Sequence, residues 1–356
     1  MKIGIIGLPQ TGKKTLFHIL TGTPAPEHAE HKKPVMGTAD IRDQRFDELV
    51  SMYRPKKEAR ARIDIALVPK LEAQEIQKGT IFGDIQNMDA LCHVVRAFED
   101  EAVYHVSGSI DPLRDIESVN QELILHDLLF IETRTERIEQ NLKKVKDAKQ
   151  QDELVLLGRM KEHLEQDLPL RMLPLEPEED LLVRSYPFIT RKEMIIALNV
   201  SESELAAGAI LEKVLERYSS DGSAVMQVSA KVEAEIAALE SEAERREFFS
   251  DLGITEHALE KLGALCIRSL GLISFFTVGE DEVRQWLVRR GATAPEAAGV
   301  IHSDLQRGFI RAEVMKYPEL KQHKTEAALK AAGKLYVKGK EYIVEEGDIL
   351  NIRFNI

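Results

Sequence analysis

Short apolar runs alternate with amphipathic stretches along the first two thirds of the chain. The run at 2–8 is followed by a stretch, 13–21, in which Leu16, Ile19 and Leu20 fall on one face of a helix. Runs of the same kind recur at 61–68, 90–95, 193–198 and 224–228. Buried strands that are separated by helical segments are typical of a mainly parallel sheet covered on both faces. We therefore predict an α/β fold.

A different pattern begins at Ile124, where apolar positions recur at alternating steps of four and three, the spacing of a coiled-coil seam. The seam comprises Ile124, Leu128, Ile131, Thr135, Ile138, Leu142 and Val145. The polar stretch 147–152 is predicted to be a turn, and a second helix would carry Leu154, Leu157, Leu164 and Leu168. Two helices joined by a short turn fold back on each other. The proline-rich stretch 169–187 then leads back to the strand at 193–198, so the arm is inserted in the sheet domain.

Beyond two further helical stretches, 232–252 and 255–269, the composition changes again at 272–279. The alternation in ISFFTV, the helix-like PEAAGVIHSDL, the strand FIRAEVM, and the pair KLYVKGKEYIV and DILNIRF predict a compact sheet crossed by one helix. With 356 residues the chain is too long for one core. We divide it into a sheet domain, 1–118 and 188–271, a helical arm, 119–187, and a third unit, 272–356.

Composition places the chain among soluble globular proteins, with 44% hydrophobic and 30% charged residues. Its formal net charge of -12 would repel phosphate backbones, so any contact with RNA requires a local basic patch. Cys92 and Cys266 lie inside apolar runs and read as reduced core residues. The start of the chain lacks the features of a secretion signal, and no stretch approaches the roughly 18 apolar residues of a membrane span. We expect a cytoplasmic protein.

The stretch GLPQTGKKT, 7–15, matches the phosphate-loop pattern G-x-x-x-x-G-K-[ST] at Gly7, Gly12 and Lys13. Glycines let backbone N–H groups converge on phosphate oxygens at a helix start, and the lysine adds a positive charge. The flanking strand and helix are the context that this motif requires. The predicted phosphate site comprises Gly7, Pro9, Gln10, Thr11, Gly12, Lys13, Lys14 and Thr15.

Lys14 departs from the motif, because it stands where a serine or threonine hydroxyl would coordinate Mg²⁺. An ammonium has three donors and no lone pair to offer a metal. One interpretation is that the Lys14 charge lies near the β-phosphate and partly replaces the metal. The alternative is that Lys14 points to solvent and Thr15 turns inward, which the helical offset of about 100° per residue disfavours.

Candidate base-binding residues follow two of the predicted strands: Asn199, Val200 and Glu202 after the strand 193–198, and Ser229, Ala230 and Lys231 after the strand 224–228. In guanine-specific phosphate-loop proteins, the aspartate of N-K-x-D accepts the guanine N–H groups and an S-A-K loop offers backbone N–H groups. Here Glu202 is one methylene longer than aspartate and Val200 replaces the lysine, so guanine selectivity should be weak. A helix cap is the alternative role for Asn199 and Glu202.

With these residues in place, the chain resembles the YchF family, the Obg-like ATPases of the translation-factor class of phosphate-loop NTPases. The resemblance is carried by the GLPxxGKxTLF start, MYRPKK at 52–57, MDALCHVVRAF at 88–98, DPLRDIESVNQEL at 111–123, NVSE, VSAKVEAEIAAL, and the carboxyl-terminal stretches 291–314 and 339–356. It implies a Rossmann-like P-loop domain, an inserted antiparallel coiled-coil arm and a carboxyl-terminal β-grasp (TGS) domain. It also implies ATP as the preferred nucleotide, with GTP possible, slow hydrolysis, and association with ribosomes and RNA.

Departures from the family pattern fall on the chemistry of the metal and the γ-phosphate. Besides Lys14, the first switch has His31 and Lys32 near the expected threonine, and the second has Leu67 where a glycine N–H senses the γ-phosphate. Asp64 alone remains as an indirect Mg²⁺ candidate. Loss of one electrostatic contact in phosphoryl transfer costs about 2.7–4 kcal/mol, roughly a hundredfold to a thousandfold in rate. We therefore predict nucleotide binding with weakened metal dependence and little or no hydrolysis, and assign no catalytic residue.

Two other readings stay open. One is a working slow ATPase or GTPase in which Thr15, Asp64 or a partner residue recovers the metal. The other is a structural adaptor that needs no nucleotide. We expect a monomer. The candidate RNA contacts are Arg284, Arg289, Arg290, Arg307, Arg311 and Lys316 in the third unit, and Lys143, Lys144, Lys146 and Lys149 on the arm, where a solvated face is the simpler interpretation.

Overall fold

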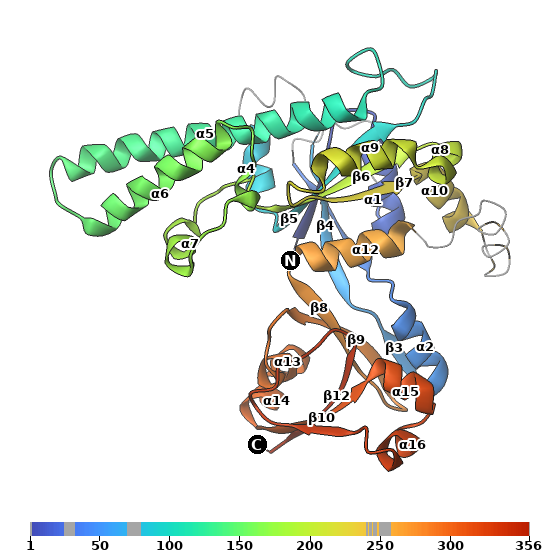
Figure 1. Cartoon of the computed structure of the whole chain (residues 1–356). Coiled ribbons are helices and arrows are strands. Elements are labelled where there is room, and N and C mark those ends of the chain that lie inside the picture. The colour runs from blue at the N-terminus through green and yellow to red at the C-terminus, as the bar shows by residue number, and fades with distance from the viewer. Residues whose placement is uncertain are drawn as a thin grey trace. The chain divides into compact units, whose positions relative to one another are not determined.

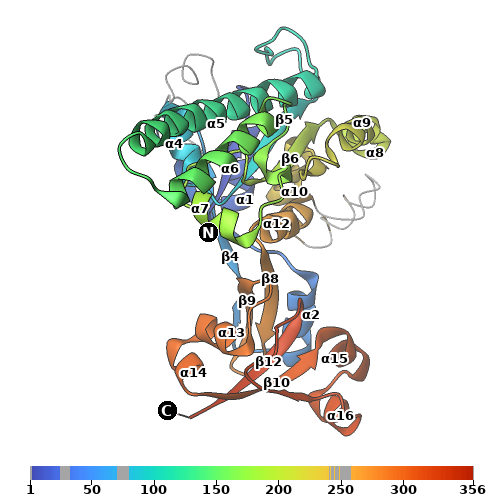
Figure 2. The same cartoon turned by 60° about the vertical axis from the view of Figure 1, so that its left-hand side comes forward.

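The computed structural model describes residues 2–24, 33–69, 80–239 and 258–355, together with positions 241, 244 and 248. The chain forms two compact units. The first contains the described residues of 1–38 and 64–258, and the second those of 39–63 and 259–356. Each unit contains a six-stranded sheet. Figures 1 and 2 show the chain from two directions.

The first sheet has the strand order β2-β4-β1-β5-β6-β7. Its strands are β1 (Lys2–Ile6), β2 (Val35–Asp40), β4 (Arg62–Leu67), β5 (Ala90–Ala97), β6 (Glu193–Val200) and β7 (Ala224–Val228). β1 pairs in parallel with β4 and β5, β5 with β6, and β6 with β7. Successive residues of a strand point to opposite faces, and both Ile5 and Ile6 are buried. The prediction of a mainly parallel sheet covered on both faces is confirmed.

Helices follow the strands of the first unit: α1 (Lys13–Thr21), α4 (Thr80–Gln86), α5 (Pro112–Leu142), α6 (Ala148–Leu164), α7 (Pro177–Val183), α8 (Glu202–Ala207), α9 (Ala209–Tyr218) and α10 (Ala230–Ala238). One core cluster joins Phe82 of α4, Val119 of α5 and Val214 of α9 to Leu91 and Val95 of β5. α1 packs against α10. The phosphate-loop helix and the helix after β7 are therefore neighbours.

α5 and α6 form the predicted helical arm and lie side by side in both views (Figures 1 and 2). Ile131 and Ile138 of α5 share a buried cluster with Leu157 and Leu164 of α6. The predicted turn at 147–152 was wrong, because Asp147 caps α6 and accepts from the N–H groups of Lys149 at 3.0 Å and Gln150 at 3.3 Å. The chain reverses before Asp147. The last seam position, Val145, follows the end of α5 and is 59% exposed.

The second sheet has the order β11-β10-β12-β8-β9-β3. Its strands are β3 (Lys57–Ala59), β8 (Leu272–Thr277), β9 (Glu282–Arg289), β10 (Phe309–Lys316), β11 (Tyr336–Lys338) and β12 (Asp348–Phe354). The helices of this unit are α2 (Gln44–Tyr53), α12 (Ala258–Ser269), α13 (Ala294–Ile301), α14 (Ser303–Arg307), α15 (Tyr317–His323) and α16 (Glu326–Ala331). Two hydrophobic clusters stabilise the sheet, one including α13 and the other including α2, α15 and α16.

The unit boundaries differ from those that the sequence predicts, because residues 39–63 belong with the carboxyl-terminal sheet. β3 pairs in parallel with β9, with Lys57 opposite Glu282. Phe46 of α2 joins a core cluster with Phe276 and Ile349. Most of α12 also falls in this unit, and several helices, rather than one, cover its sheet. Strand pairing across more than 200 residues decides this boundary. The assignment of the carboxyl-terminal sheet as a TGS domain stays a prediction.

Candidate functional site

The loop between β1 and α1 requires glycine at two positions. Gly7 has φ +143° and Gly12 has φ +90°, values that side chains rarely adopt. A Cβ on Gly7 would lie 2.4 Å from the carbonyl oxygen of Val94, and one on Gly12 would lie 2.2 Å from Nδ2 of Asn199. β5 therefore lies in close contact with the loop at Gly7, and β6 lies in close contact with it at Gly12. Gln10, at φ 59°, completes the turn.

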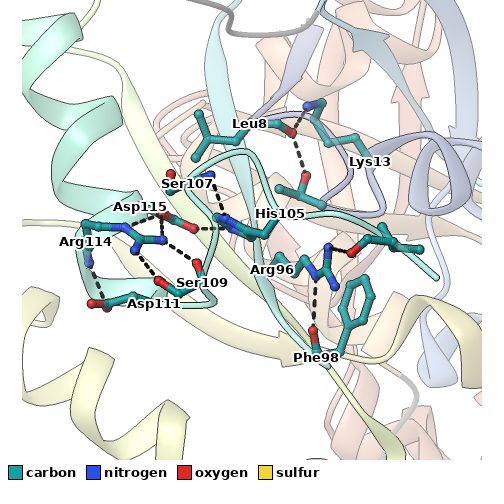
Figure 3. Close-up of polar contacts among 12 residues, drawn as sticks. Leu8, Lys13, Arg96, Phe98, His105, Ser107, Ser109, Asp111, Arg114 and Asp115 are labelled. Carbon is teal, nitrogen blue, oxygen red and sulfur yellow. Dashed lines mark hydrogen bonds and ion pairs between the residues drawn. The ribbon is translucent and has the colours of Figure 1, made fainter. Parts of the chain in front are cut away.

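Lys13 is buried at the start of α1, with 6% of its surface exposed. Its ammonium donates to the carbonyl oxygens of Gly7 and of Leu8, the latter at 2.5 Å. The hydroxyl of Thr11 donates to the same oxygen of Leu8 at 3.2 Å. Figure 3 shows Lys13 directed at Leu8. The loop thus holds a positive charge at the helix start, where partial positive charge of the backbone is also concentrated.

Lys14 and Thr15 occupy the next two positions of α1. Lys14 is half-buried, and Thr15 is exposed and lines the cavity described below. No acidic residue lies in the first turn of this helix. The helix start therefore combines two lysines with the N–H groups of its first turn, an arrangement that favours an anion.

Asn199, at the end of β6, joins the phosphate loop to the loop after β7. Its Nδ2 donates to the carbonyl oxygen of Thr11 at 2.9 Å, and its Oδ1 accepts from the N–H of Ala230 at 3.0 Å. The side chain is 4% exposed. Ser229 caps α10 by accepting from the N–H of Val232 at 3.4 Å. The structure thus brings together three segments that the sequence places about 190 and 30 residues apart.

A cavity of about 1250 Å³ lies where these segments meet. The predicted site residues that line it are Gly12, Thr15, Asn199, Val200, Glu202, Ser229, Ala230 and Lys231. The other predicted residues, Gly7, Pro9, Gln10, Thr11, Lys13 and Lys14, are not among the described residues of its lining and belong to the loop and the helix start beside it. Its volume exceeds the usual 300–1,000 Å³ of a small-molecule site.

One wall of the cavity is formed by residues that the sequence did not predict as part of a site. Phe98, Glu99 and Asp100 follow β5 and line the cavity. The fully buried guanidinium of Arg96 lies 4.6 Å over the Phe98 ring and donates to three carbonyl oxygens of this segment. The signal in the sequence was the place of these residues after a central strand, since ligands bind at the carboxyl ends of parallel strands.

The chain beyond this wall is fixed to the start of α5. The Nε2 of His105 lies 2.9 Å from Asp115 Oδ2, and its Nδ1 accepts from the N–H of Ser107 at 3.1 Å. The second bond identifies Nε2 as the protonated nitrogen that donates to Asp115. Arg114 donates to Asp115 and to the backbone oxygen of Ser109 (Figure 3). Both ring nitrogens of His105 are therefore occupied by neighbouring groups.

Asp64 lies at the wrong end of its strand to serve the phosphate loop. In the parallel pairing of β1 and β4, Asp64 is opposite Lys2, whereas Leu67 is opposite Ile5. The four steps from Lys2 to Ile6 along the strand span about 13 Å, so the Asp64 carboxylate is remote from Gly7. The residues of β4 nearest the loop are apolar. The switch residues His31 and Lys32 lie outside the described residues.

Beneath the loop, His93 of β5 is buried and its Nδ1 has no hydrogen-bond partner among the described residues. Its Cδ2 lies 3.4 Å from the position of a Cβ on Gly7. Burial and the nearby Lys13 charge lower the pKa of His93 to about 3.

In the described part of the chain, no group of three or more histidine, cysteine, aspartate or glutamate residues gathers as a metal site. We also find no described helix with the length and apolarity to span a bilayer.

The candidate RNA contacts divide by their neighbours. Lys316 pairs with Glu345 and Asp348, and Arg307 pairs with Asp304. Arg284 lies 4.1 Å over the Trp286 ring. The remaining candidates form no ion pair with a described residue: Arg289, Arg290, Arg311, Lys143, Lys144, Lys146 and Lys149. Acidic neighbours thus neutralise only part of the predicted set.

Comparison with known proteins relates the whole chain to one family. Residues 272–355 match the family model YchF-GTPase_C, described as "Protein of unknown function (DUF933)". The "Ribosome-binding ATPase YchF" of Bacillus subtilis (strain 168) is 40% identical over 99% of both chains. The "Obg-like ATPase 1" of Oryza sativa subsp. japonica is 34% identical over the whole chain and 92% of its own length.

A solved structure shares the architecture. The "Structure of the Schizosaccharomyces pombe YchF GTPase" aligns with a TM-score of 0.84 at 30% identity, over 99% of this chain and 97% of that one. The two chains therefore share the α/β fold over nearly their whole lengths. By sequence identity over its full length and by fold, the chain belongs to the YchF family.

Proposed function

We propose that this chain binds a purine nucleoside triphosphate, preferably ATP, with GTP as a weaker ligand. The phosphates would lie on the backbone N–H groups of Gly7 to Thr15 with Lys13, and the base would enter the cavity beside Asn199, Glu202 and the 229–231 loop. The proposal rests on the two hydrogen bonds that Asn199 makes, one to Thr11 and one to Ala230. These bonds connect the segment for the phosphates to the segment for the base.

The residues present do not fit Mg²⁺ at this loop. Lys14 supplies a cation where a hydroxyl would be a ligand, and the Asp64 carboxylate is about 13 Å along the strand from the loop. We therefore infer that the nucleotide binds with weak dependence on the metal. Hydrolysis would be slow or absent, since charge neutralisation by the metal is central to phosphoryl transfer.

Association with ribosomes is the cellular part of the proposal. The Bacillus subtilis and Escherichia coli O157:H7 relatives are both described as ribosome-binding ATPases, and the latter is 38% identical over the whole chain. A monomeric cytoplasmic regulator that contacts RNA through the arm lysines and the arginines of the second unit fits these names. Arg289 and Arg290, which form no ion pair with a described residue, support an RNA contact more than the neutralised Lys316 does.

A working slow ATPase is the second candidate, and one observation favours it. Thr15 lines the cavity, so its hydroxyl is available to a metal that approaches from that side. A structural adaptor with no ligand is the third reading. The cavity argues against it, because the predicted base-binding residues Asn199, Glu202 and Ser229 line it.

Calorimetric titration of ATP with excess EDTA and with Mg²⁺ separates these readings, beside a single-turnover assay. Binding of similar strength under both conditions, with little phosphate release, supports the proposal. Strict dependence on Mg²⁺ together with turnover would establish the slow ATPase. Absence of binding at millimolar ATP under both conditions would refute nucleotide binding and leave the adaptor.

A further inference from the structure

Arg96 is a fully buried cation that no carboxylate neutralises in the described part of the chain. Its side chain is 2% exposed. Nε donates to the carbonyl oxygen of Phe98 at 3.1 Å, Nη1 to that of Val103 at 2.9 Å, and Nη2 to that of Asp100 at 3.3 Å. The charge is thus satisfied by backbone oxygens alone. Desolvating a guanidinium is costly, so such an arrangement needs a function to retain it.

The three carbonyl groups belong to the segment that follows β5 and turns back over the Arg96 guanidinium, as Figure 3 shows for Phe98. Phe98 also stacks its ring 4.6 Å below the guanidinium carbon. Only arginine has donors in a rigid planar fork that can reach three oxygens in different directions. A single side chain therefore determines the path of residues 98–103.

That segment is a wall of the cavity. Phe98, Glu99 and Asp100 line it together with residues of the Asn199 and Ser229 loops. Arg96 is also the register partner of Asn199 in the parallel pairing of β5 and β6. One pair of neighbouring strand positions thus fixes two boundaries of the cavity: Asn199 holds the phosphate loop, and Arg96 holds the wall on the base side.

We propose that Arg96 is a positioning residue for the base of the bound nucleotide, acting through the 98–103 segment and not through contact with the ligand. This inference rests on the proposed function. It adds that the affinity for the nucleotide has two contributions, one from the phosphates and one from the base. The phosphate part depends on Lys13 and the loop. The base part depends on the wall that Arg96 holds, so it is lost when the fork is lost.

Arg96→Lys is the decisive variant, because it keeps the positive charge and loses the fork that joins three carbonyl groups. ATP, GTP and inorganic tripolyphosphate are titrated by calorimetry into the wild type and the variant. We expect the affinity for ATP to fall at least tenfold while that for tripolyphosphate changes less than twofold. In the Arg96→Lys variant, ATP and GTP should therefore bind about as weakly as tripolyphosphate. Arg96→Met tests the same point without the charge.

Arg171→Lys is the matched control, since Arg171 is also buried and donates to the backbone oxygen of Asp221 at 3.0 Å, but neither Arg171 nor Asp221 lines the cavity. It should bind ATP as the wild type does. Thermal unfolding and limited proteolysis check that each variant is folded. A folded Arg96→Lys variant that binds ATP unchanged would overturn the inference, as would an equal fall for ATP and tripolyphosphate. If the wild type binds neither ligand, the proposed function fails and the inference with it.

Discussion

The Nδ2 of Asn199 donates to the carbonyl oxygen of Thr11 at 2.9 Å, across 188 residues of sequence. The Oδ1 of the same amide accepts from the N–H of Ala230. One side chain thus hydrogen-bonds both the loop after β1 and the loop after β7. Because the amide is buried, neither loop can exchange this partner for water. The geometry of the phosphate loop is therefore set partly from another strand.

Asn199→Ala should disconnect the two loops. It leaves the buried N–H of Ala230 and the oxygen of Thr11 without this partner, and an unsatisfied buried group costs about 1–3 kcal/mol. We expect a loss of that size in the free energy of unfolding by urea, and weaker ATP binding by more than tenfold in calorimetry. Asn141→Ala, which removes an exposed bond to Gln150 on the arm, is the control. Wild-type ATP affinity in Asn199→Ala would contradict the role given to the amide.

Lys14→Ser restores a hydroxyl ligand at the position that follows Lys13. If Lys14 partly replaces the metal, the variant should still bind ATP, but Mg²⁺ should now strengthen the binding several-fold. Calorimetry with EDTA and with Mg²⁺ measures the change. Lys14→Ala removes the charge without adding a ligand and should bind more weakly with no response to Mg²⁺. Complete loss of binding in Lys14→Ser would instead identify Lys14 as a principal phosphate contact.

His93 should make the fold sensitive to acid. Its folded-state pKa is lowered from the ordinary 6.5 to about 3 by burial and by the Lys13 charge. Between these values the unfolded chain binds a proton that the folded chain does not, so stability falls as the pH falls below about 6.5. From pH 7.5 to pH 5 the wild type should lose about 2 kcal/mol through this residue.

His93→Phe removes the titrating group and the unpartnered Nδ1 together. Urea unfolding at several pH values should show a shallower decline below pH 6.5 for this variant than for the wild type. His302→Gln, at an exposed histidine, should follow the wild-type curve. Parallel curves for the wild type and His93→Phe would show that His93 titrates normally or that another group dominates.

Asp127 holds the base of the arm. This buried carboxylate of α5 accepts from the N–H groups of Ile189 at 3.0 Å and Thr190 at 2.8 Å, and from the Thr190 hydroxyl at 2.7 Å. Asp127→Ala leaves these donors unpaired in the interior, and we expect a loss of about 3–5 kcal/mol, near that of a broken buried pair. Thermal unfolding measures it. Asp152→Ala, at an exposed acid of α6, should change stability by less than about 0.5 kcal/mol. Similar melting temperatures for both variants would refute this role.

The sequence by itself determined the elements whose causes are local. The strand β1, the helix α1 over residues 13–21 and the two glycines of the loop follow from apolar periodicity and from backbone conformations that side chains resist. The hairpin of α5 and α6 follows from the seam that includes Ile131 and Ile138. Its turn could have been placed correctly as well, since Asp147 is a helix-capping residue.

Only the tertiary structure decided which distant segments meet. Residues 39–63 joined the carboxyl-terminal sheet because β3 pairs with β9. Asp64 is far from the phosphate loop because the register of β4 against β1 places it opposite Lys2. No local pattern fixes the register of a strand that is buried on both faces. The wall at Phe98 emerged because a buried guanidinium folds the chain back after β5. Each depends on contacts between residues far apart in sequence, and on the exclusion of water that only the assembled core provides.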